Sequence, residues 1–210
     1  MSATPTTLQT LSDNLAALAD RTAKLVAGVH GGSRRGTSGL IWQDGIVVTA
    51  NDALRHEADL RLALPDGGIA PAALIGRDPT TDIAILRAAD LRASVPPPST
   101  EAQTGALVLA VGRRNGAPVA RLGIIAEVGD PWRSMRGGQI DRLIRLDLRL
   151  DQAMEGGAVI DAAGALLGMA VFGPRGRALV IPSQTIARIV PRLLVGGSLA
   201  RGYLGLGLHR

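Results

Sequence analysis

Cysteine is absent from the 210 residues of this sequence, which excludes disulfide bonds, thiolate catalysis and cysteine-bound zinc. Aromatic residues make up only 2% of the chain, too few to build stacking platforms for bases or sugars. Val, Ile, Leu and Ala must therefore fill the core. The hydrophobic share of 46% is sufficient for one large domain or two small ones.

Long hydrophobic runs are missing too. No stretch approaches the roughly 20 apolar residues that a membrane-spanning helix needs, and the N-terminus has no apolar signal-peptide core. We expect no membrane span and a cytoplasmic location for the chain as written, or a periplasmic one if the chain is trimmed from an exported protein. Nothing in the sequence calls for a cofactor.

Lysine is almost absent, since Lys24 is the only one and every other basic residue is Arg. The formal net charge of +5 raises the question of nucleic-acid binding. However, the Arg residues are scattered in pairs or alternate with Asp along one strand, and they do not form a basic patch. We therefore expect protein or peptide partners and no nucleic acid.

The spacing of apolar residues changes twice along the chain. Leucines at positions 8, 11, 15 and 18 predict an amphipathic helix over residues 1–24. Short strands separated by Gly-rich turns follow up to about residue 182, which is typical of an antiparallel sandwich or barrel. Residues 183–197 return to helical spacing, with a break expected at Pro191.

One loop, DQAMEGG at residues 151–157, raises the main functional question. It has the frame of a nucleophile loop, yet it contains no Ser, Cys or Thr. A hydroxyl activated by a nearby base is what serine proteolysis requires. The loop is therefore a catalytic loop that has lost its catalyst, a frame for different chemistry, or an ordinary turn.

Several ordered motifs make the whole chain similar to one family. GTSGLIWQDGIVVTANDAL, RDPTTDIAILRA, ALVLAVG, LGIIAEVG, the segment around DQAMEGG and LVIPS occur in the order and spacing of the trypsin-like protease domain of the HtrA/Deg family. The chain resembles this domain from about Val29 to Leu208. Several motifs at family spacing are far more specific than any one of them.

The resemblance implies an all-β fold of two antiparallel six-stranded barrels with an N-terminal and a C-terminal helix. The expected domain covers residues 25–200, with barrels at roughly 25–94 and 101–182. Residues 201–210, RGYLGLGLHR, resemble the first strand of a PDZ domain, so we expect the chain to be cut from a longer protein. Members of the family often form trimers through N-terminal aromatic contacts, but residues 1–28 contain no aromatic residue, so a homo-oligomer, with a trimer as the form the family suggests, stays an open alternative.

Carrying the family's catalytic triad onto this sequence gives acidic residues at all three positions. The His position falls on Asp52, the orienting Asp is Asp82, and the nucleophile position is Glu155. The oxyanion-loop positions are Ala153, Met154 and Glu155. The resemblance with these departures predicts no functional catalytic residue, and hence a protein that is not an enzyme.

The leading hypothesis is a proteolytically inactive pseudoprotease that acts as a peptide-binding, protein-binding, scaffold or regulatory module. The cleft of the family binds extended chains by adding them to a strand edge. The turn with Gly173, Arg175 and Gly176 lies where the family places its specificity loop, which makes these residues candidates for peptide binding.

Two further hypotheses remain open. If Asp52, Asp82 and Glu155 share a cleft, their repulsion would raise pKa values or attract a cation, which gives a hydrolase or a site for Ca²⁺ or Mg²⁺ as the alternative, although we expect no metal. In the other hypothesis, the N-terminal helix binds a partner helix or makes a homotypic contact.

Overall fold

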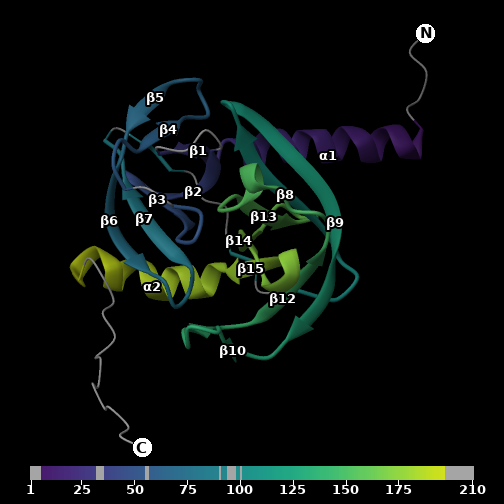
Figure 1. The fold of residues 1–210 in the computed structure, drawn as a ribbon. Coiled ribbons are helices and arrows are strands. Elements are labelled where there is room, and N and C mark those ends of the chain that lie inside the picture. Colours follow the sequence, from purple (N-terminus) through teal and green to yellow (C-terminus); the bar gives the residue numbers. More distant parts are fainter. Residues whose placement is uncertain are drawn as a thin grey trace, which may run out of the picture.

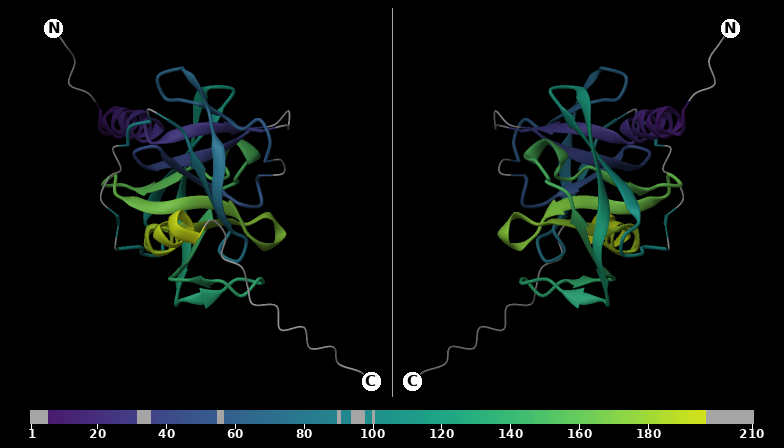
Figure 2. Two further views of the ribbon diagram at one scale, coloured as in Figure 1. Left: turned by 90° about the vertical axis from the view of Figure 1, so that its left-hand side faces the viewer. Right: turned by 90° about the vertical axis from the view of Figure 1, so that its right-hand side faces the viewer.

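The computed structural model describes residues 6–31, 36–54, 57–89, 91–93, 98–99 and 101–196. The PDZ-like stub predicted at residues 201–210 lies outside these residues. Two helices and two β lobes make up the described part (Figures 1 and 2). Neither helix is long and apolar enough to cross a membrane.

The helices confirm the expected elements at the two ends. Helix α1 spans Thr7–Ala23 and is capped by Thr6, whose hydroxyl oxygen accepts a hydrogen bond from the Gln9 amide at 3.2 Å. Helix α2 spans Ser183–Gly196 and continues through Pro191, so the break predicted at that residue was wrong. The helix continues because one of its faces is buried against both lobes, which outweighs one missing backbone bond.

The first lobe is a curved antiparallel sheet in the order β5-β4-β1-β2-β3-β7-β6. Its strands are β1 (Val26–His30), β2 (Thr37–Gln43), β3 (Ile46–Ala50), β4 (Arg61–Ala63), β5 (Ile69–Pro71), β6 (Ala73–Asp78) and β7 (Ile83–Arg87). The strands β5 and β6 form opposite edges, yet only Ala72 separates them in sequence. The chain turn at Ala72 therefore joins the two edge strands, and this half-barrel sheet has seven strands where six were predicted.

The second lobe is the predicted closed six-stranded barrel, in the order β12-β15-β14-β13-β8-β9. Its strands are β8 (Leu107–Arg114), β9 (Ala117–Gly129), β12 (Leu143–Asp147), β13 (Ala158–Asp161), β14 (Leu166–Phe172) and β15 (Ala178–Pro182). A separate small hairpin of β10 (Trp132–Arg133) and β11 (Gln139–Ile140) extends from this lobe. Two short 3₁₀ turns, Gln152–Met154 and Pro174–Gly176, lie in its loops.

Three clusters of buried side chains form the core, one inside each lobe and the largest between the lobes. Successive side chains of a strand point to opposite faces. On β8, Val108 and Ala110 therefore pack inside the second barrel, while Leu109 and Val111 pack between the lobes. Burial on both faces explains why these strands are continuous apolar runs.

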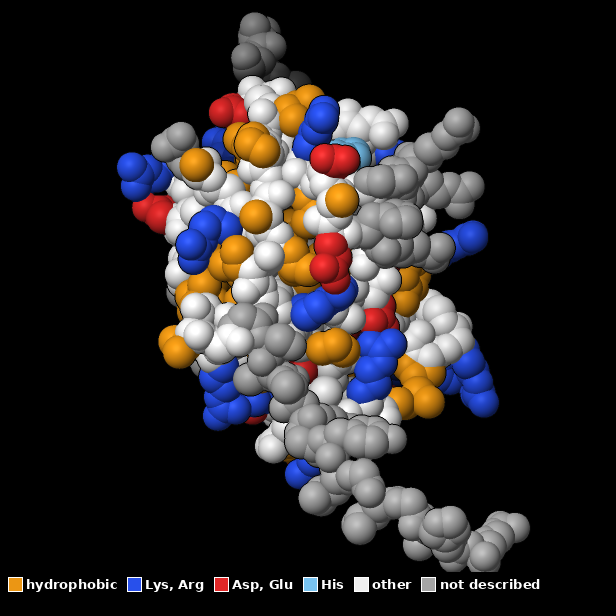
Figure 3. Space-filling view, turned by 60° about the vertical axis from the view of Figure 1, so that its left-hand side comes forward, with side chains coloured by type: hydrophobic (Ala, Val, Ile, Leu, Met, Phe, Trp, Pro, Cys, Tyr) orange, Lys and Arg blue, Asp and Glu red, His pale blue; other side chains and the backbone are white. Residues whose placement is uncertain are grey.

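The two helices cover different parts of this arrangement. Helix α2 contacts β6 and β7 of the first lobe and β14 and β15 of the second, so it bridges the two. Helix α1 packs on β8 and β9 of the second barrel (Figure 1). On the face shown in Figure 3, acidic and basic side chains lie interspersed.

A buried arginine ties the end of α1 to both lobes. The guanidinium of Arg113 donates to the carbonyl oxygens of Val26 at 2.9 Å, Gly116 at 2.6 Å and Ala23 at 2.8 Å. These carbonyls belong to β1, the β8–β9 turn and the last residue of α1. Burial lowers the pKa of Arg113 from its ordinary value, and each of its three nitrogens donates to one of these carbonyl oxygens.

We predict that Arg113→Met lowers the free energy of unfolding by about 3 kcal/mol, because three partly or fully buried carbonyl groups lose a charged donor. The matched control is Arg114→Met, which removes only a solvent-exposed ion pair with Asp151 and should cost about 1 kcal/mol or less. Urea unfolding of both variants measures the difference. Equal losses of unfolding free energy in the two variants would show that Arg113 does not hold the end of α1.

Candidate functional site

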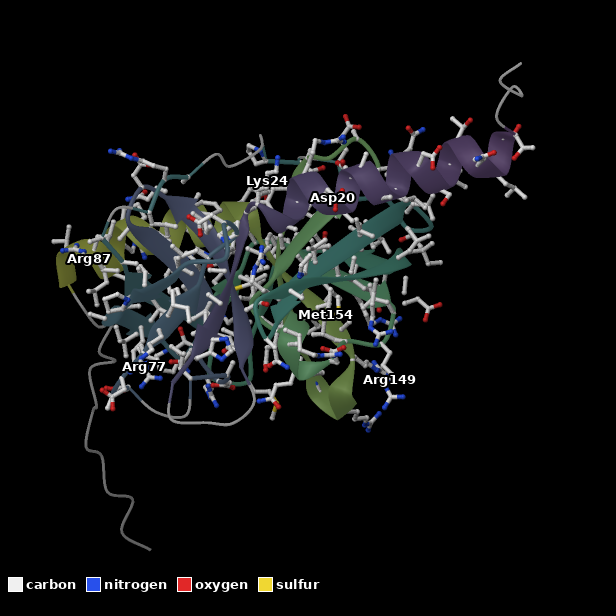
Figure 4. The ribbon with its side chains drawn as sticks, turned by 90° about the horizontal axis from the view of Figure 1, so that it is seen from above. Asp20, Lys24, Arg77, Arg87, Arg149 and Met154 are labelled. Carbon is white, nitrogen blue, oxygen red and sulfur yellow. The ribbon has the colours of Figure 1, made fainter. Side chains whose placement is uncertain are left out.

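The loop at the predicted nucleophile position forms a tight 3₁₀ turn at the junction of the two lobes. Asp151 caps the turn, since its Oδ1 accepts a hydrogen bond from the Ala153 amide at 3.0 Å. The other carboxylate oxygen of Asp151 pairs with Arg114 at 2.8 Å. Met154 is fully buried in the core of the second barrel and anchors the turn from below (Figure 4 labels it).

The start of β2 in the first lobe holds this loop through buried hydroxyl groups. Ser38 donates from its hydroxyl to the carbonyl oxygen of Ala153 at 2.6 Å, and Thr37 donates from its hydroxyl to that of Glu155 at 2.6 Å. The Ser38 amide donates to the same Glu155 oxygen at 2.8 Å. The Ser38 hydroxyl also accepts from the Arg113 amide at 2.8 Å. Hydrogen bonds between residues that are more than a hundred positions apart in the sequence therefore fix the loop.

Two glycines let the loop approach the neighbouring backbone. Gly156 has a φ of +82°, and a Cβ there would lie 2.1 Å from the carbonyl oxygen of Ser38. A Cβ at Gly157 would lie 2.2 Å from the carbonyl oxygen of Val111. Close packing therefore requires both glycines of DQAMEGG, Gly156 against β2 of the first lobe and Gly157 against β8 of its own barrel.

The amides at the predicted oxyanion positions are used inside the loop in this conformation. The Ala153 amide donates to Asp151, and the Glu155 amide donates to the carbonyl oxygen of Gln152 at 3.3 Å. An oxyanion hole needs such amides to point at the developing charge of the substrate. The loop would have to change from its 3₁₀ conformation before these amides could donate to an oxyanion.

The two acids predicted at the base and orienting positions lie side by side. Asp82 has a φ of +58°, and its Oδ1 accepts a hydrogen bond from the Asp52 amide at 2.8 Å. Burial raises the pKa of Asp82 to about 6, and the Asp52 carboxylate adds to this rise, while the Asp52 amide and Arg136 oppose it. The pair therefore holds a carboxyl group that titrates close to neutral pH.

An arginine that the sequence analysis did not single out completes this part of the site. Arg136 donates to Oδ1 of Asp52 at 2.6 Å and to the carbonyl oxygen of Pro79 at 3.2 Å. It lies in the β10–β11 hairpin, whose Ser134 donates to the carbonyl oxygen of Thr80 at 2.5 Å. The pairing with Asp52 raises the pKa of Arg136 further. The hairpin of the second lobe thus contacts the first lobe directly beside the two acids.

A cavity of about 250 Å³ opens between the lobes at this point. Asp52, Asp82 and Arg136 lie on one side of it. Its other walls are mainly apolar and come from the hairpin and from the ends of β14 and β15: Trp132, Met135, Ile140, Val171, Phe172, Pro174, Leu179 and Ile181. The nitrogen of the Trp132 ring is buried there without a hydrogen-bond partner among the described residues.

The structure brings together some of the predicted site residues and separates others. Asp52, Asp82 and Gly173 line the cavity, whereas Glu155, Arg175 and Gly176 do not. Among the described residues, no group of three His, Asp or Glu side chains is placed to hold a metal ion. The cation site suggested for Asp52, Asp82 and Glu155 stays a prediction. Glu155 is buried in the loop held by β2 and is not among the residues that line the cavity.

We predict that Gly156→Ala destabilises the protein more than Gly176→Ala does. Both glycines have positive φ, at +82° and +70°, which costs an alanine about 1 kcal/mol. Only at position 156 would the new Cβ also collide with a backbone oxygen; no atom lies within 4 Å of it at position 176. Urea unfolding of the two variants isolates the cost of the collision, and equal losses would refute the packing argument.

The raised pKa of Asp82 predicts a pH dependence of stability. A carboxyl group with a pKa of about 6 in the folded state and 3.8 in the unfolded state binds a proton more tightly when the protein is folded. The stabilisation of the folded state by protonated Asp82 is therefore fully present below pH 3.8, and it is lost as the pH rises through about 6. Asp82→Asn should remove this decline, since Asn keeps the acceptor and tolerates positive φ.

The measurement is urea unfolding of both proteins between pH 3.5 and 7. Asp44 provides a control of opposite sign, because hydrogen bonds from the Ala93 amide and Arg92 lower its pKa. The stabilisation of the folded state by the Asp44 carboxylate is therefore lost as the pH falls. Parallel pH profiles of the wild type and Asp82→Asn would contradict the assignment.

Comparison with known proteins places this geometry in a family. The profile described as trypsin-like peptidase domain matches residues 36–169. The probable periplasmic serine endoprotease DegP-like of Brucella suis is 32% identical over 186 residues, which cover 83% of this chain and 36% of that protein. The serine endoprotease DegS of Haemophilus influenzae is 29% identical over 185 residues, covering 81% and 53%. The chain thus spans about a third to a half of the length of these relatives.

Solved structures give the same result. The HtrA-type protease AlgW with a tripeptide matches with a TM-score of 0.75 at 27% identity, over 92% of this chain and 68% of that chain. Deg5 matches with a TM-score of 0.76 over 90% of this chain and 97% of that chain; at 22% identity this likeness shows the fold alone.

The relatives contradict the prediction that the protein is not an enzyme. They are named serine endoproteases, and an HtrA-type protease is among the matching structures. That prediction rested on the residue types at two positions carried over from the family, which do not by themselves show a loss of activity. The closed barrel, the curved partner sheet, the loop between them and the profile match over residues 36–169 together show that the chain belongs to the HtrA-type trypsin-like peptidase family.

Proposed function

We propose that the cleft between the lobes binds an extended segment of another protein chain. The observation that carries this proposal is a short length of strand with free backbone groups at the end of β14, directly beside the apolar cavity. Such an edge adds a peptide strand through backbone hydrogen bonds, while a neighbouring pocket takes a side chain.

The free edge follows from the pairing of β14. The Ala170 amide donates to the carbonyl oxygen of Gly157 at 2.9 Å, and the Ala170 carbonyl oxygen accepts from the Gly156 amide at 2.8 Å. Backbone groups of a strand point to the same side at every second residue. The amide and carbonyl groups of Phe172 therefore point to the side of the nucleophile-position loop, beyond the last bond to it, and have no strand partner there among the described residues.

The cavity suits an apolar side chain of the bound segment. Phe172 and Val171 form its wall at the strand edge, and Leu179 and Ile181 extend that wall. The apolar walls supply affinity by burial. The Asp52–Arg136 pair at the other side offers one acceptor and one donor to the flanking peptide backbone.

The relatives support a protein segment as the ligand. AlgW was solved with a tripeptide, and the curated relatives are endoproteases, which act on protein chains. The name of the DegP-like relatives also supports the periplasmic location among our two predictions. Self-association stays a hypothesis of the sequence analysis, with the exposed half of α1 as its candidate surface.

The test measures binding of fluorescein-labelled unfolded casein by fluorescence polarisation. Phe172→Pro removes the edge amide and should weaken binding at least about tenfold, the effect of losing one good hydrogen bond and distorting the edge. Phe172→Val keeps the amide and an apolar side chain and is the matched control. Equal affinity of the two variants, or no binding by the wild type, would refute the proposal.

The same incubation, followed by gel electrophoresis over time, measures cleavage. Cleavage that is lost in both Glu155→Ala and Asp82→Ala would assign the reaction to this cleft and support the alternative of an acid-based hydrolase. Cleavage that survives both substitutions would exclude a role of these carboxyl groups in it.

A further inference from the structure

Two arginines share one carboxylate oxygen at the start of the nucleophile-position loop. Arg114 donates to Oδ2 of Asp151 at 2.8 Å, and Arg121 donates to the same oxygen at 3.4 Å. Both belong to the β8–β9 hairpin, where Arg121 pairs with Ala110, whose side chain packs inside the second barrel. Arg114 follows on the same strand as Ala110 and lies on the same face, because side chains alternate along a strand. The hairpin therefore presents two guanidinium groups to one acid.

Asp151 is held in place by the loop itself. Its Oδ1 accepts a hydrogen bond from the Ala153 amide at 3.0 Å, and its side chain is only 26% exposed. The strand that carries Arg114 packs directly on this loop, since a Cβ at Gly112 would lie 2.5 Å from the carbonyl oxygen of Ala153. Asp151 thus fixes both guanidinium groups beside the loop.

The positive charge of this cluster exceeds its negative charge. Arg114 and Arg121 are 54% and 45% exposed, and Asp151 uses one of the five donors of each guanidinium. Neither arginine has a second acceptor among the described residues. Asp147 does not compensate them, because it pairs with Ile124, which lies on the opposite face of β9 from Arg121. The cluster therefore keeps one net positive charge and unused donors at the surface.

The loop connects these arginines to the proposed peptide edge. It starts at Asp151, which pairs with Arg114, and it ends at Gly156, whose amide donates to the carbonyl oxygen of Ala170 on β14. Both strands beside β14 are antiparallel to it, and antiparallel pairing is the more stable kind. A segment added antiparallel at Phe172 runs toward Ala170 and hence toward the loop. The residues that follow the paired one then cross the loop toward the arginines.

We propose that Arg114 and Arg121 bind an acidic side chain of the bound segment, on the C-terminal side of the apolar residue that fills the cavity. This inference rests on the proposed peptide-binding cleft and adds the class of segment that the cleft selects. A carboxylate accepts hydrogen bonds from both guanidinium groups, and such charge-assisted bonds are stronger than neutral ones. Because Asp151 already orders both arginine side chains, the ligand carboxylate loses little affinity to ordering them.

The test compares fluorescein-labelled alanine peptides by fluorescence polarisation with the whole chain. One peptide carries a leucine followed by a short run of glutamates, another has the same residues in reverse order, and the last has the leucine followed by glutamines. We expect the first peptide to bind about fivefold more tightly than the other two at low salt, which corresponds to one well-placed exposed ion pair. The difference should shrink as sodium chloride is added, because salt screens exposed charges.

A pair of variants assigns the preference to the arginines. Arg121→Gln should reduce the preference for the glutamate peptide to about twofold or less, and it leaves the contact between Arg114 and Asp151 in place. The matched control is Arg92→Gln, which removes the same charge from an exposed ion pair with Asp44 on the first lobe. The preference should persist in this control.

Equal binding of the glutamate and glutamine peptides, equal binding of the forward and reversed peptides, or equal effects of the two substitutions would overturn this proposal and leave the peptide-binding cleft standing. No binding of any of the peptides would overturn it too, and the casein measurement then decides whether the cleft itself stands.

Discussion

The hydrogen bonds from Thr37 and Ser38 to the loop at Ala153–Glu155 are the contact on which the site depends. They join the second strand of the first lobe to the loop that precedes β13 in the second. The Ser38 hydroxyl is at the same time the acceptor of the Arg113 amide, and the Arg113 side chain holds the end of α1. The loop, the lobe junction and the N-terminal helix therefore share one buried hydrogen-bond network.

The contact between Asp52 and Arg136 differs from this buried network, because it is open to solvent. Asp52 and Arg136 are about half exposed, and their ion pair is open to solvent and to screening by salt. The hairpin that carries Arg136 has only two residues in each strand, so its position depends on its contacts with Pro79 and Thr80. The lining of the cavity therefore comes partly from strands of the closed barrel and partly from a small hairpin.

Much of the fold could be predicted from local pattern and motif order. The leucine spacing gave α1, the alternation and the Gly-rich turns gave an antiparallel barrel, and the resemblance gave two lobes. Three features were beyond local rules. Whether Pro191 ends a helix depends on what the helix packs against, the bend at Ala72 depends on the closure of the first lobe, and the role of Arg136 depends on a contact 84 residues away.

The candidate site shows the same division between sequence and structure. The sequence by itself determined which residue types stand in the loop and beside it, and it identified the Gly-Gly pair, because chemistry and backbone freedom are properties of single residues. Only the tertiary structure decided that Asp52 and Asp82 share a cavity with Arg136 while Glu155 does not. The reason is that burial, pairing and raised pKa values arise between residues that are distant in sequence, and only the packing of the two lobes sets these distances.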